Sequence, residues 1–169
     1  MTNDEELYRK CLRLKNHGRD VKGSFIHEYI GFNFCFTDLQ AAVGLAQLRK
    51  LDKIIRRKAQ IREFYMKELS GINQIKFQVV NKNTSAVFWF TNIFTDEVSE
   101  LSEYLKEKGV QTRRFFYPLH KQPCYNIGGY YPNSEWAYEK GFSIPSSVIL
   151  KESELIYICS EIRNYFEGK

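Results

Sequence analysis

The apolar positions of the first seventy residues recur at helical spacing. Thr2–Glu5 has the pattern of a capping box, and an apolar stripe follows it toward Gly18, which predicts a first helix. Thr37 and Gln40 form a second capping-box pattern, and an apolar face then continues without proline to about Leu69. The sequence therefore predicts one long helix from residue 37 to about residue 69. Its first half is rich in alanine and glycine, so another backbone can approach it closely.

After Gly71 the pattern changes to short runs of β-branched and aromatic residues separated by turn signals. The expected strands are 75–80, 86–94 and 110–116, and the expected helices are 97–108, 134–140 and 152–166. A loop rich in proline, glycine and tyrosine spans 118–132. We therefore expect an α/β protein of two parts: residues 1–70 as a helical arm and residues 71–169 as a small α+β domain.

Composition narrows the class of protein. At 169 residues, with 43% hydrophobic and 27% charged residues, the chain has a globular composition. No apolar run is long enough to cross a bilayer, and the first ten residues are too polar for a signal peptide. The cysteines are scattered, which favours reduced, mostly buried thiols in a cytoplasmic protein. His17, His27 and His120 are too dispersed to suggest a metal site.

Positive charge is concentrated in one segment. Residues 49–62 contain seven lysines and arginines and a single acidic residue, Asp52. Such a stripe suits nucleic acid or a phosphorylated ligand, but more often it is the solvated face of a helix. The aromatic run Phe88–Trp89–Phe90 adds a possible base-stacking strand, so an RNA-binding module is one hypothesis.

Two stretches carry candidate chemistry. In GFNFCF, residues 31–36, alternation in an extended chain puts Phe32, Phe34 and Phe36 on one face, which we expect to be buried. Asn33 then lies on the other face, where its amide suits either a phosphate oxygen or the backbone of a loop.

The second stretch is TRRFFYPLHKQPCY, residues 112–125. Arg113, Arg114 and His120 there lie on a strand and a proline-stiffened loop, and they suit an anionic ligand. The alternative is a basic strand edge followed by a packed loop. No P-loop, GxGxxG or Ser/His/Asp order occurs in the chain.

These stretches, in this order, resemble the DegT/DnrJ/EryC1/StrS family of pyridoxal-phosphate sugar aminotransferases of fold type I. The resembling segments are HEYIGFNFCFTDLQAAVGLAQLRKLDKIIRRK, TRRFFYPLHKQPCY and GFSIPSSVILKESELIYICSEI, and the FFYPLH form is most similar to perosamine-synthase-like members. The resemblance extends over essentially the whole chain. It implies a small C-terminal domain, preceded by a helix that links it to a large domain.

The resemblance also implies a cofactor, partners and site residues. Pyridoxal 5'-phosphate would be the cofactor, a nucleotide-linked keto-sugar the substrate, and glutamate the amino donor. Asn33 would reach the cofactor phosphate of a neighbouring subunit in a homo-oligomer, whereas Arg113 and His120 would lie on the substrate side. Many relatives carry Arg or Lys where this chain has Cys35, so a cation near the phosphate is lost.

In the family, the lysine that holds the cofactor as a Schiff base precedes the segment that Met1 begins. We therefore expect this chain to be a C-terminal half without transaminase activity of its own, complemented by a separate N-terminal half or assembled with itself. We assign no catalytic residue within it. Besides the RNA-binding module, the alternative is a non-catalytic oligomerisation or regulatory subunit that uses the small-residue face of the long helix.

Overall fold

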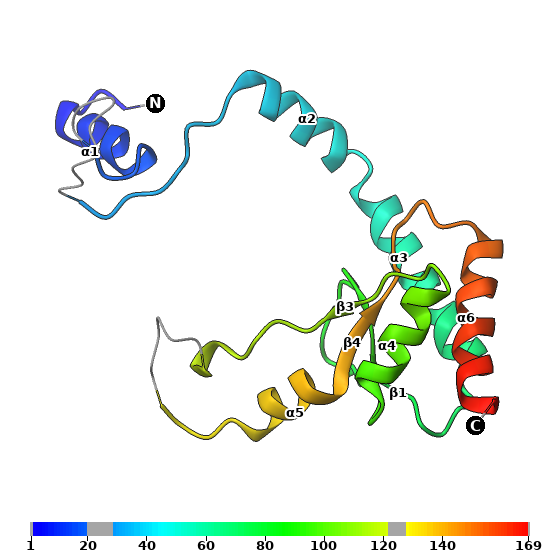
Figure 1. Ribbon diagram of the computed structural model, residues 1–169. Helices are drawn as coiled ribbons and strands as arrows, with labels where there is room; N and C mark the ends of the chain where they lie inside the picture. Colours follow the sequence, from blue (N-terminus) through cyan, green and yellow to red (C-terminus); the bar gives the residue numbers. More distant parts are fainter. Residues whose placement is uncertain (1, 20–28, 122–127, 169) are drawn as a thin grey trace. The chain divides into compact units, whose positions relative to one another are not determined.

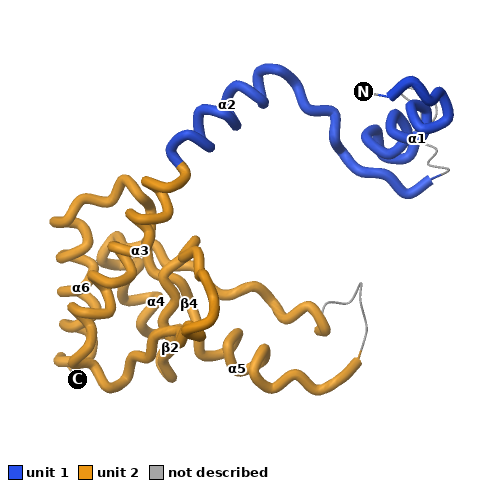
Figure 2. The backbone as a smooth tube through the Cα atoms, turned by 180° about the vertical axis from the view of Figure 1, so that it is seen from behind, with its two compact units in different colours: residues 1–50 blue, residues 51–169 orange. Residues whose placement is uncertain are grey.

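A computed structural model of the chain describes residues 2–19, 29–121 and 128–168. The chain forms two compact units, residues 1–50 and residues 51–169 (Figure 2). The first contains two helices with little buried surface. The second contains a four-stranded sheet with helices on both faces (Figure 1).

The two helices of the first unit begin at polar caps. α1 (Glu5–Lys15) is capped by Asp4, whose carboxylate accepts from the Leu7 amide at 3.0 Å, so the expected cap at Thr2 is wrong by two residues. α2 (Asp38–Leu48) has the predicted capping box. Gln40 N–H donates to the Thr37 hydroxyl at 3.3 Å, and the Gln40 side-chain oxygen accepts from the Thr37 amide at 2.9 Å.

The predicted single helix from residue 37 to residue 69 is wrong. α2 ends at Leu48, a turn follows at 49–50, and α3 (Leu51–Glu68) begins the second unit. Neither glycine nor proline marks this break. The two helices have different surroundings, because α2 has no buried residue whereas α3 buries Ile61 and Tyr65. The two compact units of the structure meet after Lys50. The domain boundary expected at residue 70 stays a prediction.

The second unit contains shorter strands than expected. Its elements in chain order are β1 (Lys76–Phe77), β2 (Thr91–Phe94), α4 (Val98–Glu107), β3 (Arg113–Arg114), the 3-10 turn η1 (Leu119–Lys121), α5 (Pro132–Lys140), β4 (Gly141–Ile144) and α6 (Glu152–Glu167). All three helices expected after residue 71 are present. β4 was not predicted, yet it lies inside the sheet, whose strand order is β1-β2-β4-β3 with every pair antiparallel.

The pleat of the sheet separates two environments. Ile93 pairs with Phe142, and both side chains are fully buried among residues of α3, α4 and α6. Asn92 pairs with Ser143, which also pairs with Arg113, so these three residues share the opposite face. α5 lies near that face, where Trp136 stacks on Phe94 at 4.9 Å between ring centroids. The core therefore belongs to one face and the polar positions to the other.

Three residues of the basic stripe have structural roles in α3. Arg57 donates to the Leu150 carbonyl at 2.7 Å, and Arg62 donates to the Gln78 carbonyl at 2.9 Å. Lys58 donates to the carbonyls of Trp89 and Ser146 at 2.7 and 2.6 Å, and its partial burial lowers the pKa of the ammonium group. These cations satisfy loop carbonyls that no strand partner satisfies.

We expect Phe142→Ala to destabilise the second unit strongly, because Phe142 is 0% exposed at the centre of the sheet. Removing a buried phenylalanine costs about 3–5 kcal/mol of the free energy of unfolding. Urea unfolding followed by circular dichroism measures the change. The control is Ile149→Ala, since Ile149 is 83% exposed and its loss is expected to change stability by less than about 0.5 kcal/mol. Equal effects of the two substitutions would contradict the core described here.

Candidate functional site

The backbone around Asn33 is held against the end of α1. The amides of Phe32 and Phe34 donate to the carbonyls of Leu14 and Lys15 at 2.7 and 2.9 Å, so they satisfy helix-end acceptors that lack an intrahelical partner. Asn33 itself forms an isolated antiparallel bridge with Asn16. Its side chain is exposed, and within the described residues its amide makes no hydrogen bond. The segment thus presents the Asn33 amide outward on an anchored backbone.

Two glycines permit this close approach. Gly18 has a φ of +74°, and a Cβ atom there would lie 1.7 Å from the Tyr29 carbonyl oxygen. A Cβ atom on Gly31 would lie 2.0 Å from the Gly18 nitrogen. No side chain fits at either position. The glycine two residues before Asn33 is therefore required by packing.

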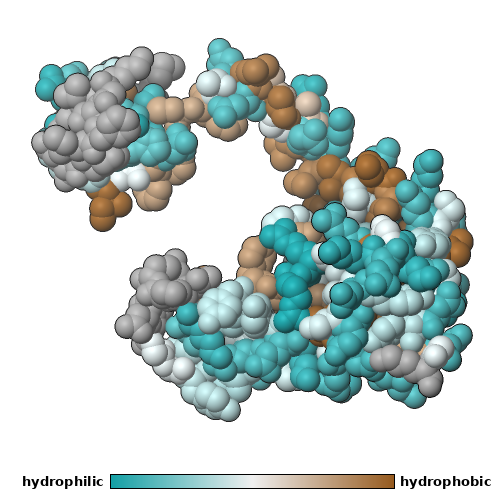
Figure 3. All heavy atoms as spheres, in the orientation of Figure 1, coloured by the Kyte–Doolittle hydropathy of each residue, from teal (hydrophilic) through white to brown (hydrophobic). Residues whose placement is uncertain are grey.

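The aromatic face of this segment is not buried. Phe32 and Phe34 do share a face, since their rings stack at 5.1 Å, but Phe34 is 65% exposed and Phe36 is also exposed. The expectation that these rings are buried is wrong within this chain. Apolar side chains are likewise exposed along α2 (Figure 3). Exposed apolar surface of this kind is typical of sites that bind another protein, a membrane or a ligand.

The expected burial of the thiols is also wrong for two cysteines. Cys11 and Cys35 are exposed, and the Cys35 thiol lies 3.6 Å from the Lys15 carbonyl oxygen. Cys159 is buried in α6, where burial raises the pKa of its thiol to about 12. Cys124 lies outside the described residues.

Arg113 and Arg114 are both exposed, but they make different contacts. Arg114 donates to the Tyr138 carbonyl at 3.0 Å and lies over the Tyr138 ring, so it fixes α5 beside the sheet. Arg113 lies over two aromatic rings, with its guanidinium carbon 5.2 Å from the Phe90 centroid and 4.7 Å from the Phe116 centroid. No carboxylate pairs with Arg113 among the residues that the structure describes.

A cavity of about 290 Å³ opens beside Arg113 and Arg114, which both line it. Phe90, Phe116 and Tyr138 contribute aromatic walls, whereas Asn92 and Ser143 contribute polar atoms. The Ser143 hydroxyl donates to the Asn92 side-chain oxygen at 2.9 Å, and the Asn92 amide donates to Gln78 at 3.2 Å. This cavity offers a cation, flat apolar walls and oriented polar groups, which is the chemistry of a site for a phosphorylated organic ligand. The polar pair Asn92 and Ser143 had no signal in the sequence, because it depends on the unpredicted strand β4.

His120 lies in a different environment from Arg113. It is not among the residues that line this cavity, and its side chain is 10% exposed. Its Nε2 lies 2.9 Å from Glu135 Oε1, and Lys121 donates to the other oxygen of Glu135 at 2.7 Å. The ring also packs on Tyr131, with centroids 4.7 Å apart. This cluster joins η1 to α5, and the substrate contact expected for His120 stays a prediction.

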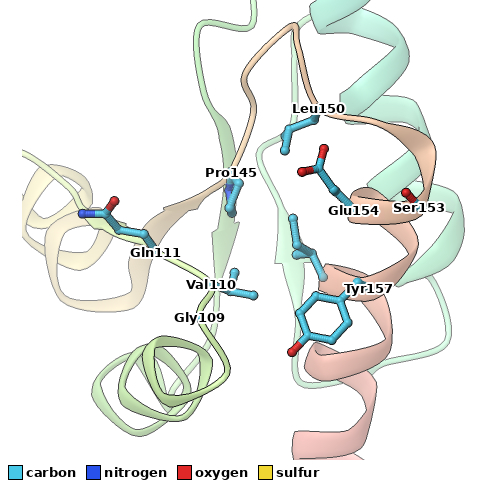
Figure 4. A pocket seen from close by; sticks show the side chains of 9 residues that line it. Gly109, Val110, Gln111, Pro145, Leu150, Ser153, Glu154 and Tyr157 are labelled. Atoms are coloured by element: carbon cyan, nitrogen blue, oxygen red, sulfur yellow. The ribbon is translucent and has the colours of Figure 1, made fainter.

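A second cavity, of about 440 Å³, lies between α6 and the segment after α4 (Figure 4). Val110, Pro145 and Leu150 line it with apolar surface, and Tyr157 closes one side by donating to the Lys108 carbonyl at 3.0 Å. Its charged side chain is the acidic Glu154, which already accepts from the Lys151 amide at 2.7 Å. An acidic, apolar cavity does not suit an anionic substrate.

A base-stacking surface on the aromatic run 88–90 would be excluded if all three rings were buried, and they are not. Phe88 and Phe90 are half-buried, but Trp89 is 63% exposed. Two basic residues of α3 near these rings are occupied, since Lys58 donates to loop carbonyls and Arg62 donates to the Gln78 carbonyl and lies 4.4 Å from the Phe88 centroid. The RNA-binding hypothesis therefore stays open.

Fold and site together define a mixed α/β domain with an exposed arginine beside an aromatic-walled cavity, and comparison with known proteins supplies the family. The model of the DegT/DnrJ/EryC1/StrS aminotransferase family matches residues 1–163, and the chain belongs to this family. The GDP-perosamine synthase of Escherichia coli O157:H7 is 34% identical over 173 residues, covering 100% of this chain and 47% of that protein. The GDP-perosamine synthase of Vibrio cholerae is 33% identical, covering 98% and 47%.

The fold also matches solved aminotransferases. The aminotransferase TlmJ from Streptoalloteichus hindustanus superposes with a TM-score of 0.79 at 24% identity, covering 98% of this chain and 46% of that one. This confirms the mixed α/β fold class. The chain spans about half the length of the relatives that it matches. No helix in the described ranges combines the length and the apolarity needed to cross a membrane.

We expect Glu135→Gln to weaken folding at neutral pH and to have little effect in acid. Hydrogen bonds from Lys121, and then from His120, lower the pKa of the Glu135 carboxyl. A lowered pKa stabilises the folded state above the unfolded value, about 4.3, and this contribution is lost as the pH falls through the folded value.

Urea midpoints at pH 7 and pH 3.5 measure this effect. The difference between the native chain and Glu135→Gln is expected at pH 7 and reduced at pH 3.5. Glu107→Gln is the control, because Glu107 is an exposed carboxylate at the end of α4. If Glu135→Gln changes the urea midpoint equally at pH 7 and pH 3.5, the negative charge of Glu135 does not contribute to stability.

Proposed function

We propose that this chain supplies the C-terminal half of a pyridoxal-phosphate-dependent aminotransferase that acts in the cytoplasm on a nucleotide-linked keto-sugar. The intact protein would transfer an amino group, with glutamate as donor, in the biosynthesis of a surface polysaccharide. The observation that carries the proposal is the family match over residues 1–163, together with relatives named as GDP-perosamine synthases that align with nearly the whole chain. Arg113 supports it, because its exposed cation suits the phosphates of such a substrate.

Among the described residues, we match Asn33 to the cofactor, and only to its phosphate. Pyridoxal phosphate, when bound, stabilises carbanions and carries the amino group between donor and sugar. Asn33 suits its phosphate, because the amide is exposed, is uncharged and is anchored through the backbone of its neighbours. In the proposal, Asn33 donates to the cofactor phosphate of a neighbouring subunit. Arg113 and the pair Asn92 and Ser143 hold the substrate without taking part in proton transfer.

The isolated chain is proposed to lack activity. A pyridoxal enzyme needs a lysine amine and a partner for the ring nitrogen of the cofactor. We assign neither role to a residue of this chain. Lys58, whose pKa is lowered by burial, donates to two carbonyls and so has a structural role.

Reconstitution tests the proposed function. Co-expression with a polypeptide that supplies the N-terminal half is expected to give a pyridoxal-phosphate absorbance band and amino transfer to a nucleotide-linked keto-sugar, whereas the chain alone gives neither. In the reconstituted protein, Asn33→Ala is expected to weaken cofactor affinity about tenfold, since one hydrogen bond to a charged group is lost.

Asn83→Ala is the matched control, because Asn83 is an exposed amide in a loop of the second unit. A band formed by the chain alone, and lost when one lysine is replaced, would disprove the proposed inactivity. Failure of the co-expressed pair to form the band would count against the aminotransferase.

Association is expected because the first unit leaves its apolar surface uncovered. Among the residues described in that unit, only Gly18 is buried, while Leu39 and Val43 of α2 are exposed. Sedimentation velocity of the chain is expected to show a dimer or a larger assembly, and Leu39→Asp is expected to shift it toward monomer.

The control is Ile149→Asp, which places a charge at an exposed apolar residue of the second unit and is expected to leave association unchanged. A monomer whose residues before Thr37 resist hydrogen exchange would contradict the prediction.

A further inference from the structure

The cavity of about 440 Å³ between α6 and the segment after α4 has no role in the proposed function (Figure 4). Its apolar lining comes from Val110, Pro145, Leu150 and Ile158. Val110 and Ile158 belong to the core, each with 4% exposure, whereas Pro145 and Leu150 are half-buried. A cavity of this size with largely apolar walls has room for a small organic ligand.

Hydrogen bonds fix the wall that the segment after α4 forms. The Tyr157 hydroxyl donates to the Lys108 carbonyl at 3.0 Å, and this bond ties α6 to the end of α4. The Val110 amide donates to the Leu105 carbonyl at 2.8 Å, and Gly109 between them has a φ of +74°. This combination closes the C-terminal end of a helix, so the chain leaves α4 in a defined direction.

The walls formed by Pro145 and Leu150 are held from α3. The Tyr65 hydroxyl donates to the Pro145 carbonyl at 2.8 Å, and Arg57 donates to the Leu150 carbonyl at 2.7 Å. Tyr65 is fully buried, so the first of these contacts lies in the core of the second unit. Because the chain itself orders these walls, a ligand would not have to order them on binding.

Glu154 is the charged side chain among the described residues that line this cavity. One of its carboxylate oxygens accepts from the Lys151 amide at 2.7 Å, and no cation pairs with Glu154 in the part of the chain that the structure describes. Its side chain is exposed and extends beside Leu150, with the Tyr157 ring on the same helix (Figure 4). Apolar walls beside a carboxylate reduce the water around an ion pair and so strengthen its attraction.

We propose that this cavity binds a small organic amine, whose ammonium group pairs with Glu154 and whose apolar body contacts Val110, Pro145 and Leu150. An amine that carries a short hydrocarbon chain or a single ring combines the two features that these walls require. The face of the Tyr157 ring also attracts a cation. This site is independent of the proposed function, because no residue that lines it is assigned to the substrate or to the cofactor.

An apolar carboxylate is the alternative ligand, because the first turn of a helix attracts anions. The charges of α6 favour the amine over this alternative. Glu152 and Glu154 place two negative charges in the first turn of α6, and the Lys151 amide is already bonded to Glu154. A carboxylate in the cavity would therefore meet negative charge, whereas an ammonium would neutralise it.

Binding of phenethylamine to the 169-residue chain tests the proposal. Phenethyl alcohol and hydrocinnamate are neutral and anionic probes of similar shape. Methyl NMR titrations measure the affinity and report on the methyl groups of Val110 and Leu150. We expect phenethylamine to shift both sets of methyl signals and to bind about tenfold more tightly than phenethyl alcohol, with hydrocinnamate the weakest of the three.

Two substitutions separate the charge from the apolar contact. Glu154→Gln is expected to weaken phenethylamine binding about tenfold and to leave phenethyl alcohol binding unchanged. Glutamine retains the oxygen that accepts from the Lys151 amide, so the cap of α6 is retained as well. Leu150→Ala is expected to weaken the amine and the alcohol alike, because it removes apolar contact from both.

Glu152→Gln is the matched control for Glu154→Gln. It removes the same charge from the same turn of α6 but does not line the cavity, and it is expected to change phenethylamine affinity less than twofold. The proposal is overturned if phenethylamine fails to bind at millimolar concentration, if phenethyl alcohol or hydrocinnamate binds as tightly, or if Glu152→Gln has as large an effect as Glu154→Gln.

Shifts that leave the methyl groups of Val110 and Leu150 unmoved would also overturn the proposal, since the amine would then bind at another carboxylate. None of these measurements uses pyridoxal phosphate or an N-terminal half. Amine binding without reconstituted amino transfer would retain this site and remove the proposed function, and the reverse result would remove this site alone.

Discussion

The central position of β4 is the constraint on which the second unit depends. Because β4 pairs with β2 on one side and β3 on the other, Phe142 faces the helices while Ser143 faces Asn92 and Arg113. A shift of one residue in this register would exchange the two faces, placing a phenylalanine in the polar cavity and a serine in the core. Folding of the core and construction of the candidate site therefore require the same strand pairing.

Features that depend on neighbouring residues were predictable from the sequence. The capping box of Thr37 and Gln40 formed as expected, since both partners lie within one helical turn. β4 was missed because its four residues are all buried, so the alternation that marks a half-exposed strand is absent. The break between α2 and α3 was missed because neither glycine nor proline marks it, and it coincides with the change from exposed to packed surroundings.

The candidate site was predictable in its residue types but not in their roles. Arg113 and Arg114 are adjacent and chemically identical and both line the cavity, yet Arg114 binds the Tyr138 carbonyl while Arg113 lies over the Phe90 and Phe116 rings, a difference that the sequence does not reveal. The basic stripe likewise suggested a ligand surface. Much of its charge instead satisfies carbonyls of distant loops, and a backbone acceptor leaves no mark in the sequence.

The two units differ in how far each completes its own packing. The second unit has a continuous apolar core, whereas the described part of the first exposes the rings beside Asn33 and the apolar side chains of α2. In the proposed assembly, covering this surface would also bring Asn33 to a neighbouring subunit. Ligands that bind only the assembled state stabilise it by mass action, so cofactor binding and subunit association would strengthen each other. Replacing the Asn33 amide would then weaken subunit association as well as cofactor binding.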